Sequence, residues 1–323
     1  MNDSTATSGP QADRPLHQLW LGRETPPETP IELTAGPVTA LLYQGDLRHV
    51  RIGDVELAQR IYVAVRDAVW NTIPGEITDL DVRSGDGTFT VEFTCEHRYR
   101  EIDFEWRARI RGDRDGTISY EMAGSPRTAF RYAKIGLNVH HPLRECVGRP
   151  YRASTPAGEI SGILPVEIEP QLIVDDQLTA LFRDYDALTI ELDGGLEARF
   201  SFSGEAFEMQ DHRNWTDANL KSYAGPLSQP WPFDARPGQE LRQVVHVSPA
   251  GTPPPPSSSS AAAGRAIALS VDDGALSPVP PLGLALDDAR RSCRRARRGC
   301  CARCARRTCA WISLRPIPRS RTS

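Results

Sequence analysis

The sequence predicts an all-β fold, an antiparallel β-sandwich that spans residues 31–248. Three observations support this prediction: many short segments alternate apolar and polar residues, Gly and Asp mark tight connections between them, and few segments have a helical pattern. Alternation with period two places every second side chain on one face of a strand. Many short strands with few helices favour a sandwich over an α/β fold.

The clearest predicted strand is 102–110, where five apolar residues from Ile102 to Ile110 alternate with charged residues. Residues 89–95 and 118–122 alternate in the same way, and connections containing Gly and Asp at 84–87 and 112–116 predict hairpins, so these three segments predict a meander. Further strands are expected at 36–43, 47–52, 135–140, 188–193, 197–203 and 240–247, with another hairpin at 192–196. The segments 57–69 and 176–184 are predicted as short helices.

Both ends of the chain differ in composition from the predicted sandwich. Residues 1–30 are rich in Pro, Thr, Ser and charge, and we expect a disordered arm with one apolar segment at 16–21. Residues 249–264, PAGTPPPPSSSSAAAG, predict a Pro/Ser/Ala linker. Residues 265–288 contain two strand-like segments, RAIALSV and PPLGLAL, and are expected to start a second, truncated domain.

Charge separates a tail from the rest of the chain at Asp288. The net charge of all 323 residues is −4, yet the residues after Asp288 include 12 arginines and no acid. Removing those arginines leaves 26 basic and 42 acidic residues, so residues 1–288 carry a net charge of −16. Five of the seven cysteines also lie in residues 289–323. The tail therefore has a different composition from the acidic body.

The Arg/Cys tail, 289–323, is best explained as an out-of-frame translation. A zinc site needs two close cysteine pairs separated by a small fold, and this tail has no such spacing; a nucleic-acid-binding arm fits no better. Cys and Trp codons read in the neighbouring frame become NTG, which encodes only Leu, Val or Met. In that frame, aliphatic residues at helical spacing stand in place of Cys300, Cys301 and Cys304.

Several classes of function are disfavoured by composition and motifs. No run of about 18 apolar residues predicts a membrane span, and the N-terminus lacks the features of a secretory signal. Cys95 and Cys146 are isolated, which is typical of a reduced cytoplasmic protein but leaves one disulfide open. No phosphate loop, GxSxG or HExxH motif occurs. We expect no cofactor, no metal, no nucleic acid and no membrane partner.

Two segments interrupt the alternation with dense polar and aromatic residues: GLNVHHPLREC (136–146) and FEMQDHRNWTDANLKSY (207–223). Carboxylates and amides accept hydroxyl hydrogens, Arg and Lys donate, and Trp packs on C–H faces, so such a set suits a sugar or polyol. A histidine beside a carboxylate can also move protons near neutral pH. The candidate substrate-binding residues are His140, His141, Arg144, Glu145, Glu208, Asp211, Arg213, Asn214, Trp215, Asp217, Lys221 and Tyr223.

A structural interpretation of the same residues needs no ligand. Asp211 and Arg213 would form a buried ion pair that organises a long loop, while Trp215 and Trp231 would fill the end of the core. On physical grounds alone this structural interpretation is preferred.

These two segments, together with RIYVAVRDAVWNTIP (60–74), resemble the N-terminal half of the D-apionate lactonase family. The resemblance extends from about Leu19 to Asp288, and its most specific part is the RNWTD string at 213–217. It implies a supersandwich-like β-sandwich followed by a TIM-type barrel, whose first strand would be PPLGLAL. It also implies hydrolysis of a sugar lactone, D-apionolactone, to D-apionate. His212 departs from the family pattern, where Gln is expected.

Because TIM barrels place active sites at the C-terminal ends of their strands, the resemblance assigns no catalytic residue here. We expect the intact protein to be a lactonase, a carboxylic-ester hydrolase, and the 323-residue chain to be inactive without its barrel, which would dock on the sandwich. Two alternatives are a non-catalytic carbohydrate-binding sandwich and a mutarotase-like sandwich. In the latter, His140 or His141 would act with Glu208 on a sugar ring.

Overall fold

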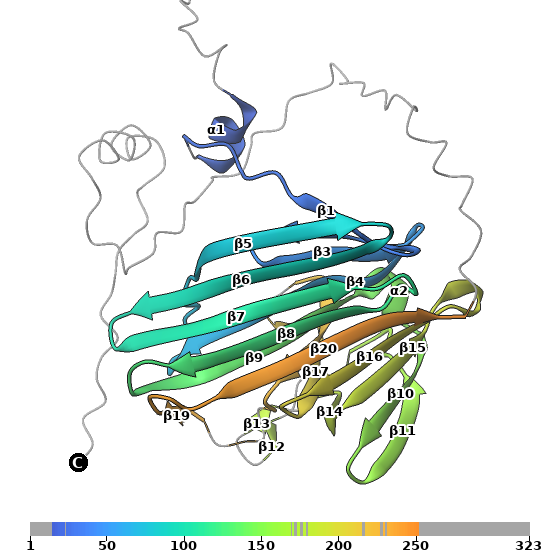
Figure 1. The fold of residues 1–323 in the computed structure, drawn as a ribbon. Helices are drawn as coiled ribbons and strands as arrows, with labels where there is room; N and C mark the ends of the chain where they lie inside the picture. Colours follow the sequence, from blue (N-terminus) through green and yellow to red (C-terminus); the bar gives the residue numbers. More distant parts are fainter. Residues whose placement is uncertain are drawn as a thin grey trace, which may run out of the picture. The chain divides into compact units, whose positions relative to one another are not determined.

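Two nine-stranded antiparallel sheets form the fold (Figure 1). The computed structural model describes residues 15–251, except 23, 169, 171–172, 175–176, 179, 215–216, 227–228 and 230. Sheet A has the strand order β1-β2-β3-β4-β9-β18-β17-β14, with β19 paired to β9, and sheet B has the order β11-β10-β15-β16-β20-β8-β7-β6-β5. The all-β antiparallel sandwich predicted from alternation is therefore confirmed.

The elements have the following bounds. Sheet A contains β1 (Ile31–Ala35), β2 (Val38–Tyr43), β3 (Asp46–Ile52), β4 (Val55–Asp67), β9 (Phe130–Pro142), β14 (Phe182–Tyr185), β17 (Phe207–Gln210), β18 (Asn219–Ala224) and β19 (Phe233–Ala235). Sheet B contains β5 (Glu76–Gly85), β6 (Thr88–Tyr99), β7 (Ile102–Gly112), β8 (Ile118–Pro126), β10 (Pro150–Thr155), β11 (Gly158–Ile163), β15 (Ala187–Glu191), β16 (Glu197–Ser203) and β20 (Leu241–Ala250). Short elements are α1 (Leu16–Leu21), α2 (Leu143–Cys146), η1 (Asp193–Gly195), and the separate pair β12 (Ile173–Val174) and β13 (Gln177–Leu178).

The hydrophobic core lies between the two sheets. Phe93 of β6 and Trp106 of β7 contact each other edge to face, with ring centroids 5.4 Å apart. Tyr120 of β8 is almost fully buried, and its hydroxyl donates a hydrogen bond of 2.7 Å to the carbonyl of Gly45, in the turn between β2 and β3. Because burying a hydroxyl is costly without a partner, this bond both satisfies Tyr120 and joins sheet B to sheet A.

Sheet B follows the predicted meander closely. The expected strands 89–95, 102–110 and 118–122 lie within β6, β7 and β8, which pair in sequence order. The predicted strand 197–203 coincides with β16, and the hairpin at 192–196 contains η1. These strands bury one face and expose the other, as the burial pattern of β7 shows. Alternation is a reliable signal for strands of this kind.

The predicted helix at 57–69 is wrong, because these residues belong to the long strand β4. Leu57, Ala58, Ile61 and Val65 have a spacing that is also typical of a helix face. In the structure most of β4 is buried on both faces, so its sequence lacks the clean alternation of a half-exposed strand. The second predicted helix, 176–184, is also wrong where it is described, since 177–178 and 182–184 belong to strands β13 and β14.

Several elements were not predicted. Strands β1, β5, β10 and β11 had no sequence prediction, and Leu16–Leu21 forms helix α1 within the segment expected as a disordered arm. The expected linker, the truncated barrel and the Arg/Cys tail, apart from 249–251, lie outside the described residues. No helix in the described ranges is long and apolar enough to cross a membrane.

The two cysteines of the sandwich are buried free thiols. Burial raises the pKa of Cys95 to about 12 and raises the pKa of Cys146 above its usual range. Because the thiolate is the reactive form, N-ethylmaleimide near neutral pH should leave both cysteines unmodified in the folded protein and modify both in guanidinium chloride. Peptide mass spectrometry separates them from the five tail cysteines. Native labelling of Cys95 at the rate of Cys309 would contradict this burial.

Candidate functional site

The candidate site is a buried polar face of sheet A, the face directed away from sheet B. On β9, His141 contacts Phe200 of sheet B, with ring centroids 4.8 Å apart, so His140 points to the opposite face. The strand register places Arg60 of β4 and Lys221 of β18 directly beside His140, one on each side. These three polar side chains therefore form one row across three neighbouring strands.

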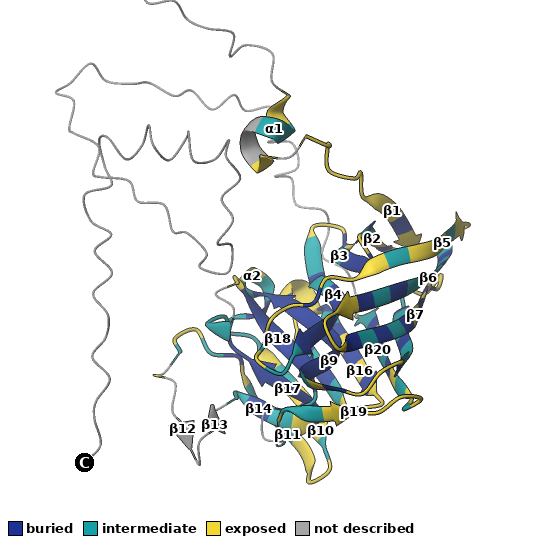
Figure 2. Ribbon diagram, turned by 90° about the vertical axis from the view of Figure 1, so that its left-hand side faces the viewer, coloured by how far each residue is buried: buried dark blue, intermediate teal, exposed yellow. Residues whose placement is uncertain are grey.

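A second row extends this arrangement along the strands. Tyr62, Asn138, Tyr223 and Glu208 lie side by side, two residues along from the first row. The complete set, called the polar face below, is Asp46, Arg48, Arg60, Tyr62, Arg66, Lys134, Asn138, His140, Glu208, Gln210, Lys221 and Tyr223. Figure 2 shows β9 and β18, two central strands of this face, mostly in the colour of buried residues, and β4 partly in that colour.

Charged groups on the polar face are removed from water to an unusual degree. The exposed fractions are 0% for Lys221, 1% for Glu208, 4% for His140 and 5% for Lys134. An isolated charge buried in this way is very costly, so buried ions are normally paired, hydrogen-bonded or bound to a ligand. The polar face must therefore supply partners for most of these groups.

Most of the ions on the polar face do have partners. The Arg60 guanidinium donates to Asp46 at 2.8 Å and lies over the Tyr62 ring, 3.8 Å from its centroid. Lys134 Nζ donates to the carbonyl of Gly225 at 2.5 Å, and its ammonium lies 4.9 Å from the Tyr223 ring centroid. These contacts hold the two ends of the polar face in fixed positions.

Three buried polar atoms on β9 have no hydrogen-bond partner within the described residues: Nδ1 of the core-facing His141 and two atoms on the polar face. The two on the polar face are Nε2 of His140 and Oδ1 of Asn138, on side chains that are 4% and 0% exposed. The Nδ2 group of Asn138 donates to the carbonyl of Gly136 at 3.1 Å, so the amide orientation leaves the oxygen as an acceptor. Native proteins rarely bury such atoms unpaired, and a bound ligand or water normally satisfies them.

The electrostatic environment keeps His140 neutral. Burial, together with the neighbouring positive charges of Lys221 and Arg60, lowers the pKa of His140 to about 3. Burial also lowers the pKa of Lys134 and of Lys221 to about 8. Near neutral pH the face therefore combines a neutral imidazole with two ammonium groups. The imidazole Nε2 can accept a hydrogen bond from a ligand hydroxyl.

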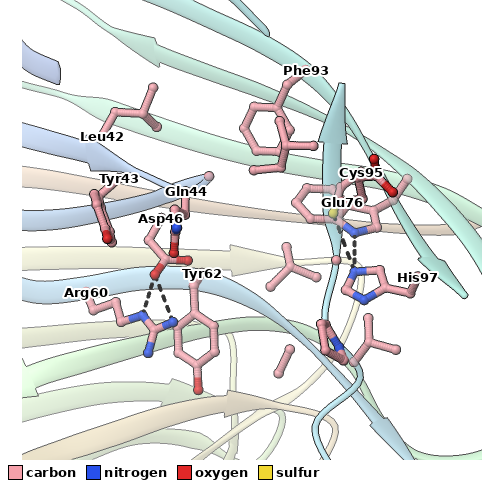
Figure 3. Close-up of a pocket in the computed structure, with 18 of the residues that line it drawn as sticks. Leu42, Tyr43, Gln44, Asp46, Arg60, Tyr62, Glu76, Phe93, Cys95 and His97 are labelled. Atoms are coloured by element: carbon pink, nitrogen blue, oxygen red, sulfur yellow. Dashed lines mark hydrogen bonds and ion pairs between the residues drawn. The ribbon is translucent and has the colours of Figure 1, made fainter. Parts of the chain in front are cut away.

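A cavity of about 860 Å³ adjoins the β4 side of the polar face (Figure 3). Arg60 and Tyr62 line it on the sheet A side, and Phe93, Cys95 and Trp106 line it on the sheet B side. The ion pair between Asp46 and Arg60 is visible beside Tyr62 in Figure 3. The cavity is therefore polar next to the face and apolar next to the core.

On the sheet B side of this cavity, the indole of Trp106 donates to Nε2 of His97 at 3.0 Å, and Nδ1 of His97 contacts the carbonyl of Ile73 at 2.9 Å. These two bonds assign the proton of the ring to Nδ1 and leave His97 fully engaged. His97 therefore supports the wall of the cavity.

Two tryptophans lie near the Lys134 end of the polar face. Trp70 follows β4, and Trp231 precedes β19, the strand that pairs with β9 at Tyr132. Their rings meet edge to face at 5.4 Å, and Trp231 is 47% exposed. The expectation that Trp231 fills the end of the core is therefore wrong. A half-exposed aromatic ring beside polar groups suits the C–H face of a sugar.

The structure brings four of the predicted site residues together on the polar face: His140, Glu208, Lys221 and Tyr223. Glu208 and Tyr223 belong to strands β17 and β18. All four residues of β17 and all six residues of β18 are buried within sheet A.

Other predicted residues lie elsewhere. His141 faces the core, Arg144 is exposed on α2, and Glu145 is half-buried, with its pKa raised by burial. Asp217 is exposed, and Trp215 lies outside the described residues.

Asp211 and Arg213 form the ion pair of the structural interpretation. The Arg213 guanidinium donates to both carboxylate oxygens of Asp211, at 3.0 and 2.8 Å, and its backbone N–H donates to the same carboxylate at 2.9 Å. The backbone N–H of half-buried Asn214 donates to the Asp211 carbonyl at 3.2 Å. Asp211 therefore fixes the turn that follows β17.

Six residues that build the centre of the polar face were not predicted: Arg60, Tyr62, Arg66, Lys134, Asn138 and Gln210. Those on β4 were missed because the strand was interpreted as a helix. A signal for the others was present, since Lys134, Asn138 and His140 occur at even positions among apolar residues. That pattern marks a strand with a polar second face.

Comparison with known proteins identifies the family. Residues 18–252 match the model of the family described as "D-apionate lactonase, N-terminal domain". The chain belongs to the D-apionate lactonase family. The resemblance stated from sequence is thus confirmed over 18–252, which includes the whole polar face, and it stays a prediction for residues beyond 252.

A curated D-apionate lactonase from Brucella anthropi is 32% identical to this chain over 238 residues. The aligned part covers 71% of this chain and 37% of the B. anthropi lactonase. The aligned region is therefore a minor part of the longer B. anthropi lactonase.

Comparison with solved structures gives matches of low sequence identity and low TM-score. A putative aldose 1-epimerase from Escherichia coli K12 has 11% identity and a TM-score of 0.44, covering 69% of this chain and 99% of the epimerase. An aldose epimerase homologue from C. elegans has 9% identity and a TM-score of 0.43, with the same coverage. An α-galactosidase from Lactobacillus brevis has a TM-score of 0.39 at 9% identity, covering 68% of this lactonase-family chain and 39% of the galactosidase.

Proposed function

We propose that this domain binds a sugar lactone or its hydrolysis product on the polar face, as the N-terminal part of a D-apionate lactonase. The observation that carries the proposal is the pair of unpartnered buried atoms, His140 Nε2 and Asn138 Oδ1, between ionised side chains. Both atoms can accept hydrogen bonds, which is what the hydroxyl groups of a sugar require. Membership of the D-apionate lactonase family supports D-apionolactone as the ligand to test.

The overall reaction proposed for the full-length family is hydrolysis of an ester within a ring. Water adds to the lactone carbonyl, the bond from the carbonyl carbon to the ring oxygen breaks, and a carboxylate and a hydroxyl group result. We assign binding and orientation to the polar face, and we place the bond-breaking step outside it. The greater length of the B. anthropi lactonase supports this division. Binding of this kind lowers the entropy cost of reaction in the complete enzyme.

Isothermal titration calorimetry on the 323-residue chain tests the binding proposal. D-Apionolactone and D-apionate should each bind, and His140→Leu should weaken the tighter interaction about 10-fold, since it removes the acceptor atom. His246→Leu, on the exposed face of β20, is the matched control and should bind like the parent chain. Circular dichroism verifies that both variants are folded.

Three outcomes would contradict the proposal. Absence of binding of either compound, with a folded protein, would leave the polar face without a carbohydrate ligand. Acceleration of anomer interconversion by the chain, abolished in His140→Leu, would replace the lactonase assignment by the mutarotase-like alternative. Hydrolysis of D-apionolactone by this chain, lost in His140→Leu, would move the chemical step onto the polar face.

A further inference from the structure

Both lysines of this chain lie on the polar face. The 38 basic residues comprise 36 arginines and only two lysines, Lys134 on β9 and Lys221 on β18. Each is at most 5% exposed. A lysine ammonium is a compact charge with three donors, whereas an arginine guanidinium is a larger planar group. Every lysine ammonium of this chain is therefore located on the polar face.

The polar face is cationic within an acidic protein. It contains five cationic side chains (Arg48, Arg60, Arg66, Lys134 and Lys221) and two carboxylates (Asp46 and Glu208). Asp211, which borders the face, is already paired with Arg213. Residues 1–288 as a whole carry a charge of −16, so the positive excess is local. A local excess of this sign attracts an anion and disfavours a cation.

Lys221 is the least compensated of these cations. Its hydrogen bond within the described residues is a long one, 3.4 Å to the carbonyl of Asn219 on its own strand. Among the described residues its ammonium forms no ion pair, while Asp217 and Asp211 act on it only at longer range. By contrast, Arg48 and Arg60 share the carboxylate of Asp46. Lys221 therefore retains hydrogen-bonding capacity toward a ligand.

We propose that Lys221 binds the carboxylate of an open-chain aldonate, while His140 Nε2 and Asn138 Oδ1 accept hydrogen bonds from its hydroxyl groups. The register supports this division, because Lys221 lies directly opposite His140, and Asn138 lies two residues further along β9 on the same face. This inference rests on the proposed function and specifies it. The domain prefers the ring-opened carboxylate, the hydrolysis product, over the neutral lactone.

The physical reason for the preference is charge. A carboxylate forms charge-assisted hydrogen bonds with a buried ammonium, and these are about twice as strong as bonds between neutral groups. The lactone carries no charge and leaves Lys221 uncompensated. A neutral alditol of the same carbon skeleton keeps the hydroxyl groups and lacks only the carboxylate, so it isolates this single interaction.

Calorimetry with three probes tests the inference: D-apionate, D-apionolactone and the neutral alditol of D-apionate. On the full chain near neutral pH, D-apionate should bind about 10-fold more tightly than either neutral probe. Lys221→Met should abolish this difference while it leaves alditol binding within about 2-fold. Arg131→Met is the matched control, because Arg131 lies on the same strand as His140 but is exposed. Its binding should equal that of the parent chain.

The pH dependence of the unmodified chain gives a second readout that does not require a variant to fold. Burial lowers the pKa of both lysines to about 8, so D-apionate binding should weaken as the pH rises from about 7 to about 9.5. The other charged or titratable groups around them are on the polar face or act on the two lysines from its border: Asp46, Arg48, Arg60, Arg66, Glu208, His140, Tyr62, Tyr223, Glu205, Asp211 and Asp217. Burial raises the pKa of both tyrosines. Alditol binding should remain constant over this range.

The outcomes separate the inference from the proposed function. Equal affinity for D-apionate and the alditol, or a preference that persists in Lys221→Met, would overturn the carboxylate assignment while carbohydrate binding stands. Failure of all three probes to bind would contradict both the carboxylate assignment and the proposed carbohydrate binding. If Lys221→Met does not fold, D-apionate affinity that is constant between about pH 7 and about pH 9.5 is the overturning result.

Discussion

Acidification is expected to destabilise the sandwich by several kcal/mol, because two buried histidines resist protonation in the folded state. Burial lowers the pKa of His141 and of His140 from 6.5 to about 3, with the positive charge of Lys221 contributing at His140. In the unfolded chain both rings regain their ordinary pKa. Between these two values the unfolded state binds more protons, so stability is fully present above pH 6.5 and declines as the pH falls toward 3.

The expected loss is large relative to the stability of a typical domain. Each unit of pKa difference corresponds to about 1.4 kcal/mol, so each histidine contributes on the order of 4–5 kcal/mol across the whole window. Domains of this size are usually stable by about 5–15 kcal/mol. At about pH 4, near the ordinary pKa of the carboxylates, the two histidines together remove about 7 kcal/mol, which is comparable to the whole stability of a domain at the lower end of this range.

Urea denaturation followed by fluorescence at several pH values between about 7 and about 4 measures this loss. His141→Gln, which replaces a titratable ring by a neutral amide, should reduce the slope of unfolding free energy against pH. His246→Gln on the exposed face of β20 should leave the slope unchanged. An unfolding free energy that does not change over this pH range would show that the buried rings titrate normally.

The success of sequence-based prediction differs between the two sheets for a physical reason. Strand β7 buries Phe104 and Trp106 on one face and exposes Arg107 and Arg109 on the other, so its alternation is visible in the sequence. Strand β4 is largely buried on both faces, and its polar side chains alternate with apolar ones only in part. A strand covered on both sides cannot be distinguished from a buried helix by periodicity alone.

The same difference limits prediction of the site. His140 and Lys221 were found from local polar density, because they occur in segments rich in charged residues. Arg60 was missed, since it reaches the site only through the pairing of β4 with β9, a contact of 80 residues in sequence separation. The two halves of the polar face are related by strand register, and register between distant segments is not encoded in any local pattern.

The second large effect expected concerns the core beside the polar face. Ser222 of β18 is fully buried, and its hydroxyl lies between two polar groups of sheet A. The Tyr185 hydroxyl donates to Ser222 Oγ at 2.6 Å, and Ser222 Oγ is 2.7 Å from Nε2 of His141. The Ser222 hydroxyl therefore joins the Tyr185 hydroxyl to the ring of His141.

Ser222→Ala should lower the unfolding free energy by about 2–4 kcal/mol. The substitution removes little volume, but it leaves the Tyr185 hydroxyl and His141 Nε2 without partners in a region closed to water. An unpaired buried polar group costs about 1–3 kcal/mol, and here one substitution creates two of them. Ser201→Ala, at an exposed position of β16, is the matched control and should change stability by less than about 0.5 kcal/mol.

A double-mutant cycle determines why Ser222→Ala loses unfolding free energy. The loss arises either from the unpaired groups left on Tyr185 and His141 or from removal of the serine hydroxyl itself. Tyr185→Phe removes the first donor, so adding it to Ser222→Ala should cost less than the sum of the two single changes. The difference measures the coupling through the serine hydroxyl. Additive losses would mean that Tyr185 and Ser222 act independently. In that case the chain of hydrogen bonds from Tyr185 to His141 would not be what holds His141 in its position against Phe200.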